Sequence, residues 1–228
     1  MLHKLSSIQA LRGLAALLVV LFHAFGLAED LGPSDSLALI WGFGSVGVDV
    51  FFVVSGFIMF FIRDRYVGTN SVRPGHFLWK RFVRVLPPYW VYTSIVVFLF
   101  IAAPMLFKGE TPSLLRSLLL IPDENPYFLM VGWTLSYELY FYLLFAVTLL
   151  IARDAMTHFA LIAAYFLFST LLGTVIDLPG PIFAFITSHV HFEFLLGAAI
   201  CVFGRGLEKL KWSHLFGQVC SVSKVYRV

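Results

Sequence analysis

The chain has 228 residues, of which 60% are hydrophobic, 17% aromatic and only 13% charged. Soluble domains carry about 25% charged residues, so this composition excludes an ordinary soluble protein. The formal net charge of +3 at pH 7 does not indicate nucleic-acid binding, because the positive residues follow the predicted membrane topology.

Apolar stretches of about twenty residues, the length that crosses a bilayer, recur along the chain. In chain order they are residues 8–27, 41–62, 88–107, 131–152, 158–176 and 181–203. Each must be a helix, because lipid offers no partner for backbone polar groups. The sequence therefore predicts an all-α fold, a polytopic transmembrane bundle of about six spans. We expect residues 1–205 to form one membrane domain and residues 206–228 a polar cytoplasmic tail.

Positive residues orient this bundle. If the N-terminus is cytoplasmic, every Lys and Arg except Lys108 and Arg116 falls on the cytoplasmic side, as the positive-inside rule requires. Cys201 and Cys220 then lie on the reducing side, and no disulfide is expected. A cleaved signal peptide is the alternative for the first stretch, but further apolar stretches follow it.

The first stretch contains two ionisable residues, Arg12 and His23. Such groups cost roughly 2.5 to 3.5 kcal/mol each in a spanning helix, so they persist mainly where a bundle interior or a wet cavity uses them. A separation of about three turns places both on one face, roughly 16 Å apart along the axis, so one groove could hold both. The alternatives are a snorkelling Arg12 at the interface and a satisfied interior His23.

Carboxylates interrupt two later stretches. The second stretch carries Asp49, which we expect to be buried, near a run of small residues that includes Ser55. Small residues permit close helix packing in membranes. The fourth stretch carries Trp133 and Glu138. Asp49 and Glu138 are candidate functional groups, and structural ion pairs with Arg12 or another cation are the alternative.

A cationic cluster precedes the third stretch and consists of Lys80, Arg81 and Arg84. We expect it in a basic cytoplasmic loop of residues 63–87, where it could bind phosphates or simply anchor the protein at the membrane. On the other side of the membrane, residues 113–120 predict a short helix lying on the surface.

The sixth stretch contains His189, His191 and Glu193, which raise the question of a metal site. Residues two apart on a helix point about 200° apart, so only His189 and Glu193 share a face. A zinc site needs at least three protein ligands. We therefore expect no metal ion.

Together these groups fit two functions. A basic cluster can hold the phosphates of a cytoplasmic donor, while an imidazole deeper in the bundle takes a proton from an attacking hydroxyl, as acyl transfer requires. Buried His, Asp and Glu side chains also relay protons in a proton-coupled transporter or flippase. The residues alone leave both functions open.

The motifs also occur in a characteristic order. They are Arg12 and His23 at R-x10-H spacing after Ser7-Ile8-Gln9-Ala10-Leu11, then Gly47-Val48-Asp49-x-Phe51-Phe52-x-x-Ser55-Gly56-Phe57, then Arg81-x-x-Arg84 with Pro87, and finally Trp133-x-Leu135-x-x-Glu138-x-x-Phe141-Tyr142. This combination resembles the acyltransferase-3 family of bacterial integral membrane acyltransferases. It is most similar to the exopolysaccharide-production branch, whose members are assigned to O-acetylation of sugars in secreted polysaccharides.

The resemblance implies a protein of the bacterial inner membrane with an acyl-CoA, preferably acetyl-CoA, as co-substrate and no permanently bound cofactor. The acceptor would be a polysaccharide or a lipid-linked sugar, with membrane lipid and polysaccharide-assembly proteins as further partners and no nucleic acid. His23, Arg12 and Glu138 match the catalytic positions, and Lys80, Arg81 and Arg84 the donor-binding ones. Asp49, Ser55 and Trp133 would support the site. His23 would act as general base or form an acyl-histidine intermediate.

The resemblance also implies about ten spans, whereas six are predicted here. It covers roughly residues 5–205. A C-terminally truncated chain is therefore expected, and an inactive truncated bundle is the third interpretation beside the acyltransferase and the transporter.

Overall fold

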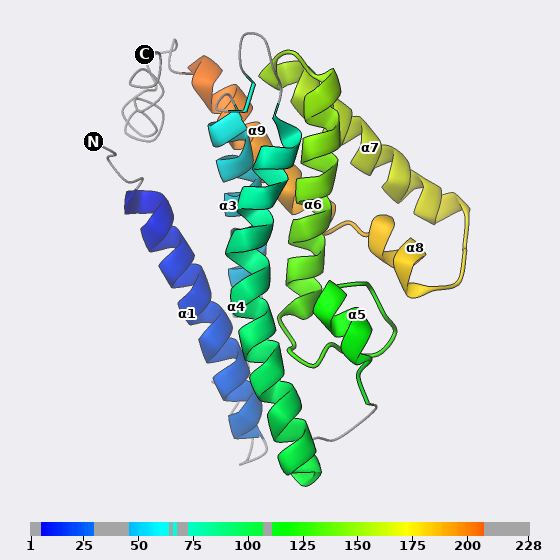
Figure 1. Ribbon diagram of the computed structural model, residues 1–228. Coiled ribbons are helices and arrows are strands. Elements are labelled where there is room, and N and C mark those ends of the chain that lie inside the picture. The colour runs from blue at the N-terminus through cyan, green and yellow to red at the C-terminus, as the bar shows by residue number, and fades with distance from the viewer. Residues whose placement is uncertain (1–5, 30–45, 64–65, 68–72, 107–110, 208–228) are drawn as a thin grey trace. The chain divides into compact units, whose positions relative to one another are not determined.

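The computed structural model describes residues 6–29, 46–63, 66–67, 73–106 and 111–207. Every element assigned in these residues is a helix, which confirms the predicted all-α fold (Figure 1). The chain divides into two compact units. The terminal unit comprises Met1–Arg63 and Phe192–Val228, and the central unit comprises Asp64–His191.

The described residues of the terminal unit form three helices. They are α1 (Ser6–Glu29), α3 (Val46–Ile62) and α9 (His191–Leu207) from its second residue onward. Glycines bring their backbones together. A Cβ atom on Gly47 would lie 2.7 Å from the Ala15 carbonyl oxygen on α1. A Cβ atom on Gly56 would lie 2.0 Å from the Phe194 carbonyl oxygen, and one on Gly197 would lie 1.8 Å from the Val53 carbonyl oxygen. This reciprocal packing of α3 and α9 is the small-residue packing expected between helices in lipid.

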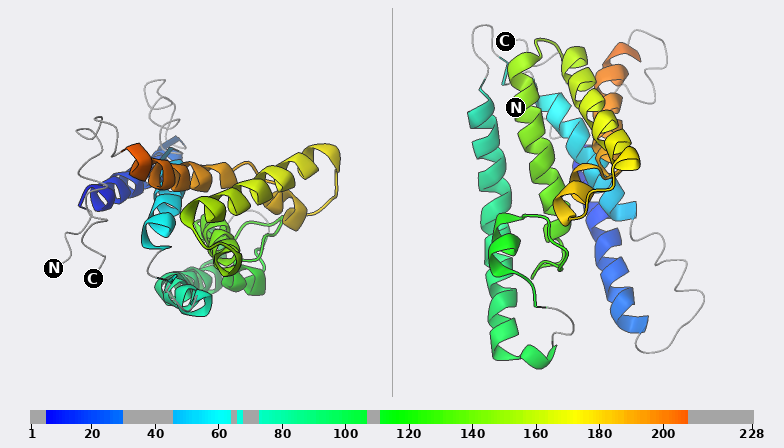
Figure 2. Two further views of the ribbon diagram at one scale, coloured as in Figure 1. Left: turned by 90° about the horizontal axis from the view of Figure 1, so that it is seen from above. Right: turned by 90° about the vertical axis from the view of Figure 1, so that its right-hand side faces the viewer.

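The central unit is built around α6 (Gly132–Ile151), which contacts α4 (Pro74–Ala102) and α7 (Ala155–Val175). Figures 1 and 2 show α4 and α6 running side by side, and α7 slanting away from α6. The shorter elements are η2 (Pro104–Leu106), α5 (Leu114–Leu119) and α8 (Pro181–Ile186). Helices α4 and α6 are antiparallel, because Phe77 near the start of α4 packs on Phe145 near the end of α6, with ring centroids 5.0 Å apart. Aromatic rings thus form much of this core.

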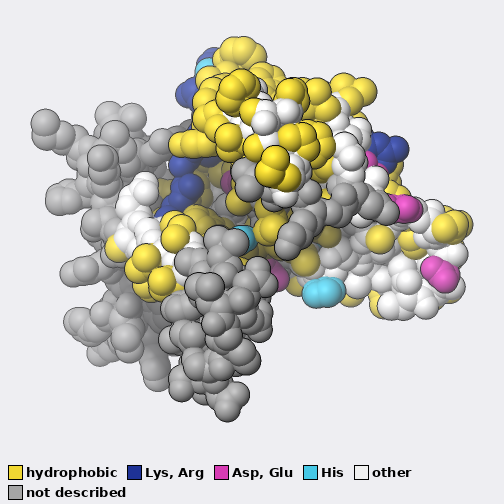
Figure 3. All heavy atoms as spheres, turned by 90° about the horizontal axis from the view of Figure 1, so that it is seen from below, with side chains coloured by type: hydrophobic (Ala, Val, Ile, Leu, Met, Phe, Trp, Pro, Cys, Tyr) yellow, Lys and Arg dark blue, Asp and Glu magenta, His cyan; other side chains and the backbone are white. Residues whose placement is uncertain are grey.

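Four helical segments of the described residues are long and apolar enough to cross a membrane. They are Pro74–Ala102, Gly132–Ile151, Ala155–Val175 and Pro181–Gly204, the last of which contains α8 and α9. The first two predicted spans correspond to shorter apolar segments, Ile8–His23 and Val46–Ile62. Large apolar side chains of α4 such as Phe98 and Ile101 are exposed, and hydrophobic side chains cover a large share of the coloured surface in Figure 3. Exposed apolar area on this scale suits a protein surrounded by lipid.

The structure differs from the sequence prediction at the third and sixth stretches. Helix α4 begins at Pro74, well before the span predicted from Pro88, and includes Pro87 and Pro88 in its interior. The cationic cluster is therefore helical and does not lie in the loop we expected. Membrane helices tolerate interior prolines when neighbouring groups satisfy the freed carbonyls. The sixth stretch is broken between Ile186 and His191 into α8 and α9.

The short helix predicted at residues 113–120 is confirmed as α5, Leu114–Leu119. Ser113 caps its N-terminus by accepting a hydrogen bond from the Arg116 backbone N–H, as serine commonly does. Leu120 ends the helix in the left-handed conformation, with φ of 55°. Tyr89 and Trp90 of α4 hold α5 in place by donating to the carbonyl oxygens of Ser117 and Leu118, at 2.8 and 2.9 Å.

Candidate active site

Arg12 and His23 both lie on α1, as the sequence predicted, with Arg12 half-buried and His23 exposed. The His23 ring is held by its own helix, because Nδ1 lies 2.8 Å from the Val19 carbonyl oxygen. A carbonyl oxygen only accepts, so Nδ1 carries the proton in the neutral imidazole and Nε2 carries the lone pair. A general base needs this tautomer if Nε2 is to take a proton from a substrate.

Asp49 is exposed, contrary to the burial predicted for it. Gly47, two residues earlier, faces α1, and residues two apart point to nearly opposite sides of a helix. Asp49 therefore points away from α1, and it interacts electrostatically with Glu193 of α9. The Glu193 Oε2 atom is buried without a hydrogen-bond partner. Ser55 is half-buried, further along α3.

Arg81 is buried in the central unit, with only 8% of its surface exposed. Its guanidinium carbon lies 5.5 Å from the centroid of the Phe77 ring and 5.8 Å from that of the Tyr142 ring. Aromatic faces attract cations at this distance, which offsets part of the cost of burial. Phe77 lies one turn before Arg81 on α4, and Tyr142 comes from α6. Rings from two helices, Phe77 and Tyr142, therefore form an aromatic cage for the Arg81 guanidinium.

Lys80 and Arg84 flank Arg81 on α4 but are exposed. Of the three predicted donor-binding cations, these two present their charges at the surface of the central unit, while Arg81 directs its charge inward. Arg84 is also near enough to act electrostatically on the Tyr142 hydroxyl.

Glu138 is half-buried on α6 and accepts a hydrogen bond from the Tyr142 hydroxyl, one turn further along. Tyr142 thus connects three predicted site residues, Glu138, Arg81 and Arg84, yet it was not itself predicted to belong to the site. Glu138 and Tyr142 are four residues apart, the spacing at which side chains on a helix meet, and this spacing was the sequence signal that could have predicted their contact.

The predicted site residues are divided between the units. Arg12, His23, Asp49 and Ser55 belong to the terminal unit, and Lys80, Arg81, Arg84, Trp133 and Glu138 belong to the central unit. The structure brings Arg81 and Arg84 of α4 and Glu138 of α6 together around Tyr142. It also shows an electrostatic interaction between Asp49 and Glu193 that no sequence pattern indicated.

Trp133, at the start of α6, lines an aromatic pocket of about 540 Å³. Its other walls include the rings of Tyr127, Tyr137 and Phe185, together with Asp123 and Glu124. Trp133 and Tyr137 meet edge to face, with centroids 6.1 Å apart. The loop before α6 and helix α8 thus place aromatic faces and carboxylates around one space.

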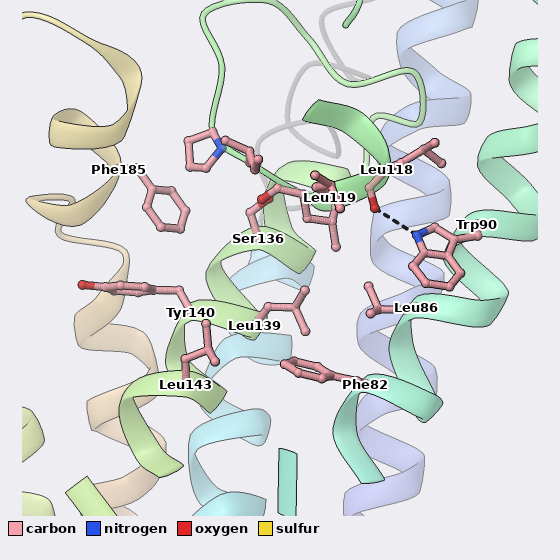
Figure 4. Close-up of a pocket in the computed structure, with 13 residues that line it drawn as sticks. Phe82, Leu86, Trp90, Leu118, Leu119, Ser136, Leu139, Tyr140, Leu143 and Phe185 are labelled. Carbon is pink, nitrogen blue, oxygen red and sulfur yellow. Dashed lines mark hydrogen bonds between the residues drawn. The ribbon is translucent and has the colours of Figure 1, made fainter. Parts of the chain in front are cut away.

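A second, aliphatic pocket of about 340 Å³ lies between α4, α5, α6 and α8 (Figure 4). Its walls include Leu86 of α4, Leu119 of α5, and Leu139 and Leu143 of α6. Pro122 and Phe185 line both pockets, so the two are neighbours. Sequence reasoning missed both pockets, because their walls come from helices far apart in the chain.

His191, considered above as a metal ligand, is fully buried among aromatic rings. Its Nε2 atom donates to the Phe185 carbonyl oxygen at 2.9 Å, and its ring stacks on Phe166 with centroids 4.5 Å apart. His189 is exposed. Within the described part of the chain, no group of three or more His, Cys, Asp or Glu side chains is arranged to hold a metal ion.

Comparison with known proteins relates these features to a family. The family model described as "Acyltransferase domain" (acyltransferase-3) matches residues 5–223. The chain is also 34% identical over 190 residues to "Exopolysaccharide production protein ExoZ" of Rhizobium meliloti (strain 1021), a match that covers 79% of this chain and 55% of the relative. The chain thus spans about half the length of this curated relative. No solved structure matches it significantly.

The family match includes every residue of the four motifs and nearly the whole chain. In the structure these motifs lie on α1, α3, α4 and α6. The chain belongs to the acyltransferase-3 family.

Proposed function

We propose that this chain carries the acyl-transfer site of an integral membrane O-acyltransferase. The enzyme moves an acyl group, preferably acetyl, from cytoplasmic acyl-CoA to a sugar hydroxyl of an exopolysaccharide or a related cell-surface glycan. Family membership supports the acyl-transfer chemistry. The name of the relative ExoZ, an exopolysaccharide production protein, supports the glycan acceptor.

The observation that carries the proposal is the hydrogen bond from His23 Nδ1 to the Val19 carbonyl oxygen. It leaves Nε2 as the basic nitrogen of the neutral ring. In the proposed reaction, Nε2 takes the proton of a sugar hydroxyl as its oxygen attacks the thioester carbonyl carbon. The carbon–sulfur bond then breaks, the leaving sulfur takes the proton back from His23, and CoA is released as the free thiol. General base catalysis of this kind contributes typically 10² to 10⁴ in rate.

Donor binding is assigned to the central unit. Lys80 and Arg84 are exposed and suited to hold the phosphates of CoA by charge-assisted hydrogen bonds. Arg81, behind them, positions Tyr142 and through it Glu138. On the orientation predicted from the positive residues, this end of α4 faces the cytoplasm, where acyl-CoA is found.

The experiment is an acyl-transfer assay with the full chain reconstituted in vesicles. Radiolabelled acetyl-CoA is supplied on one side and a saccharide acceptor on the other. Label recovered in ester linkage on the saccharide, with release of one CoA per ester, is the expected result. Movement of saccharide without consumption of acetyl-CoA would instead establish a transporter and contradict the proposal.

A further inference from the structure

The aromatic pocket of the central unit is built from rings. Tyr127, Trp133, Tyr137 and Phe185 line it, and its volume of about 540 Å³ is in the range of small-molecule sites. The centroids of Trp133 and Tyr137 lie 6.1 Å apart, and those of Tyr137 and Phe185 lie 4.3 Å apart. Because the face of an aromatic ring carries negative potential, rings gathered around one space can attract a cation.

The charge at this pocket is also negative. Asp123 and Glu124 line it, whereas no Lys, Arg or His side chain of the described residues does. Arg116 compensates one of the two carboxylates, because its Nη1 atom lies 3.0 Å from Asp123 Oδ1. Glu124 is exposed and has no ion-pair partner in the described part of the chain. One uncompensated carboxylate therefore remains beside the rings.

The side chains that line the pocket offer few hydrogen-bond donors to a ligand. The Tyr127 hydroxyl lies 2.8 Å from Ser136 Oγ, and Ser136 itself donates to the Leu120 carbonyl oxygen, so Tyr127 is the donor to Ser136. Burial raises the pKa of Tyr127, which keeps its proton in this bond. The Tyr137 hydroxyl is hydrogen-bonded to Ser188. A ligand that only donates therefore suits the pocket better than one that also needs donors.

The walls of the pocket are held in place. The Tyr127 ring lies so close to α6 that a Cβ atom on Gly132 would be 2.8 Å from it. Asp123 Oδ1 accepts from the Glu124 backbone N–H at 2.9 Å as well as from Arg116. The loop with the carboxylates is thus fixed to itself and to the helix that supplies Trp133. Preorganised walls lower the entropy cost of binding.

The pocket lies at one end of a segment that can cross the membrane. Trp133 is the second residue of α6, which is long and apolar enough for a span. Lipid headgroups lie at the ends of such segments, and Trp and Tyr side chains are enriched at this depth. Helix α5, which precedes the two carboxylates in the chain, exposes Leu115 and Leu119. The surroundings of the pocket therefore suit contact with lipid.

We propose that the aromatic pocket binds an organic ammonium group, whose positive charge lies against the rings and beside the Glu124 carboxylate. Aromatic cages recognise ammonium ions in this way, and the attraction grows as water is excluded. A primary ammonium group fits the scarcity of donors, because it donates hydrogen bonds and accepts none. The headgroup of an aminophospholipid and a small amine from solution are the two sources of this group. The inference goes beyond the proposed function and does not depend on acyl transfer.

The test compares two phospholipids that differ only in the group attached to the phosphate. Phosphatidylethanolamine ends in an ammonium group, and phosphatidylglycerol with the same acyl chains ends in a neutral diol. The full chain in detergent, without acyl-CoA, is titrated with each lipid, and native mass spectrometry measures the bound fraction. We expect phosphatidylethanolamine to bind at least about fivefold more tightly, the effect of an ammonium group in an aromatic cage.

Matched variants locate the site. Glu124→Gln removes the uncompensated charge and Trp133→Ala removes one ring, and each should lower the affinity for phosphatidylethanolamine by about threefold to tenfold without lowering that for phosphatidylglycerol. The controls are Asp154→Asn, an exposed carboxylate before α7, and Trp79→Ala, an exposed ring of α4. Both should keep the affinities of the original chain. Because Glu124 is exposed, its variant remains informative if Trp133→Ala fails to fold. Equal lipid affinities in Glu124→Gln and Asp154→Asn would overturn the proposal.

A second measurement identifies the source of the ammonium group. Ethanolamine is added to the full chain in nanodiscs of phosphatidylglycerol, and thermal unfolding is followed, because a ligand of the folded state stabilises it. Preference for phosphatidylethanolamine in the first experiment assigns the pocket to a lipid headgroup. Stabilisation by ethanolamine without that preference, and its loss in Glu124→Gln, assigns the pocket to a free amine. The absence of both effects would contradict an ammonium site.

Discussion

The Tyr142 hydroxyl donates a hydrogen bond to the Glu138 carboxylate, one turn earlier on α6. The same Tyr142 ring lies against the buried Arg81 guanidinium, 5.8 Å from the ring centroid. A tyrosine outside the predicted site therefore links a cation of α4 to a carboxylate of α6. On the proposed function, this arrangement holds the Glu138 carboxylate in one direction, and Tyr142 is a positioning residue.

Tyr142→Phe should slow acyl transfer without weakening donor binding. The variant keeps the ring that packs on Arg81 but removes the hydrogen bond to a carboxylate, which is worth about 1.5 to 3 kcal/mol. We expect kcat to fall by about tenfold to a hundredfold and KM for acetyl-CoA to stay within about twofold. Steady-state kinetics on reconstituted protein measure both. Tyr92→Phe, an exposed tyrosine of α4, is the matched control, and an equal loss in that variant would argue against a specific role.

Arg81 and Arg84 should behave differently although both belong to one motif. Arg81→Gln leaves the cage of Phe77 and Tyr142 without its cation, so we expect a lower unfolding temperature. Arg84→Gln removes an exposed charge, so we expect an unchanged unfolding temperature and a KM for acetyl-CoA raised by about tenfold, the effect of one lost phosphate contact. Thermal unfolding in detergent and donor titrations separate the two effects. A lower unfolding temperature in Arg84→Gln together with an unchanged unfolding temperature and a raised KM in Arg81→Gln would contradict the placement of Arg81 behind the donor site.

Gly197→Ala should destabilise the terminal unit, because the added Cβ would lie 1.8 Å from the Val53 carbonyl oxygen. Such overpacking costs typically 1 to 3 kcal/mol. Gly75→Ala is the control, since a Cβ there meets nothing within 4 Å. Thermal unfolding of both variants gives the comparison. Equal stability of the two would mean that α3 and α9 do not approach each other as described.

Much of the fold followed from the sequence because length and hydropathy determine which segments can cross lipid. The short helix α5 was also predictable, since Ser113 gives a local start signal. The start of α4 was missed, because the residues before Pro88 include the basic cluster and lie outside the apolar run on which the span was predicted. The break between α8 and α9 was missed because its apolar composition is continuous.

The candidate site was predictable only in part. Motif spacing predicts His23, Arg81 and Glu138 as site residues, and their roles stay a prediction. The burial of Arg81 could not be predicted, because it depends on rings from two helices. The exposure of Asp49 depends on which face of α3 meets α1, and the apolar run around it contains no sign of that choice. Both pockets depend on where α5 and α8 pack against α6. Such relationships arise only when the helices are assembled.

The protein should lose stability in acid, because the stabilising contribution of the Asp154 carboxylate is lost there. This carboxylate caps α7 by accepting hydrogen bonds from the Thr157 hydroxyl and backbone N–H, at 2.6 and 2.8 Å. These bonds lower the pKa of Asp154 below its ordinary value of 3.8. A lowered pKa in the folded state means that the carboxylate stabilises the fold above its unfolded pKa, and that this contribution is lost as the pH falls through the folded pKa.

Asp154→Asn should therefore flatten the pH dependence of the unfolding temperature below about pH 4. The amide oxygen can still cap the helix, so the variant changes the titration more than the fold. Asp177→Asn, in the connection between α7 and α8, should retain the pH dependence of the original chain. If Asp154→Asn shows the same decline in acid as the original chain, the cap does not contribute in this way.

The central claim is that His23 takes the proton from the attacking hydroxyl. The most direct measurement is the rate of [¹⁴C]acetyl transfer from acetyl-CoA to saccharide by His23→Ala in vesicles, with His189→Ala, an exposed histidine outside both pockets, as control. We predict a fall of at least about a hundredfold in His23→Ala, the usual contribution of a general base, and an unchanged rate in His189→Ala. An undiminished rate in His23→Ala would contradict the proposed mechanism.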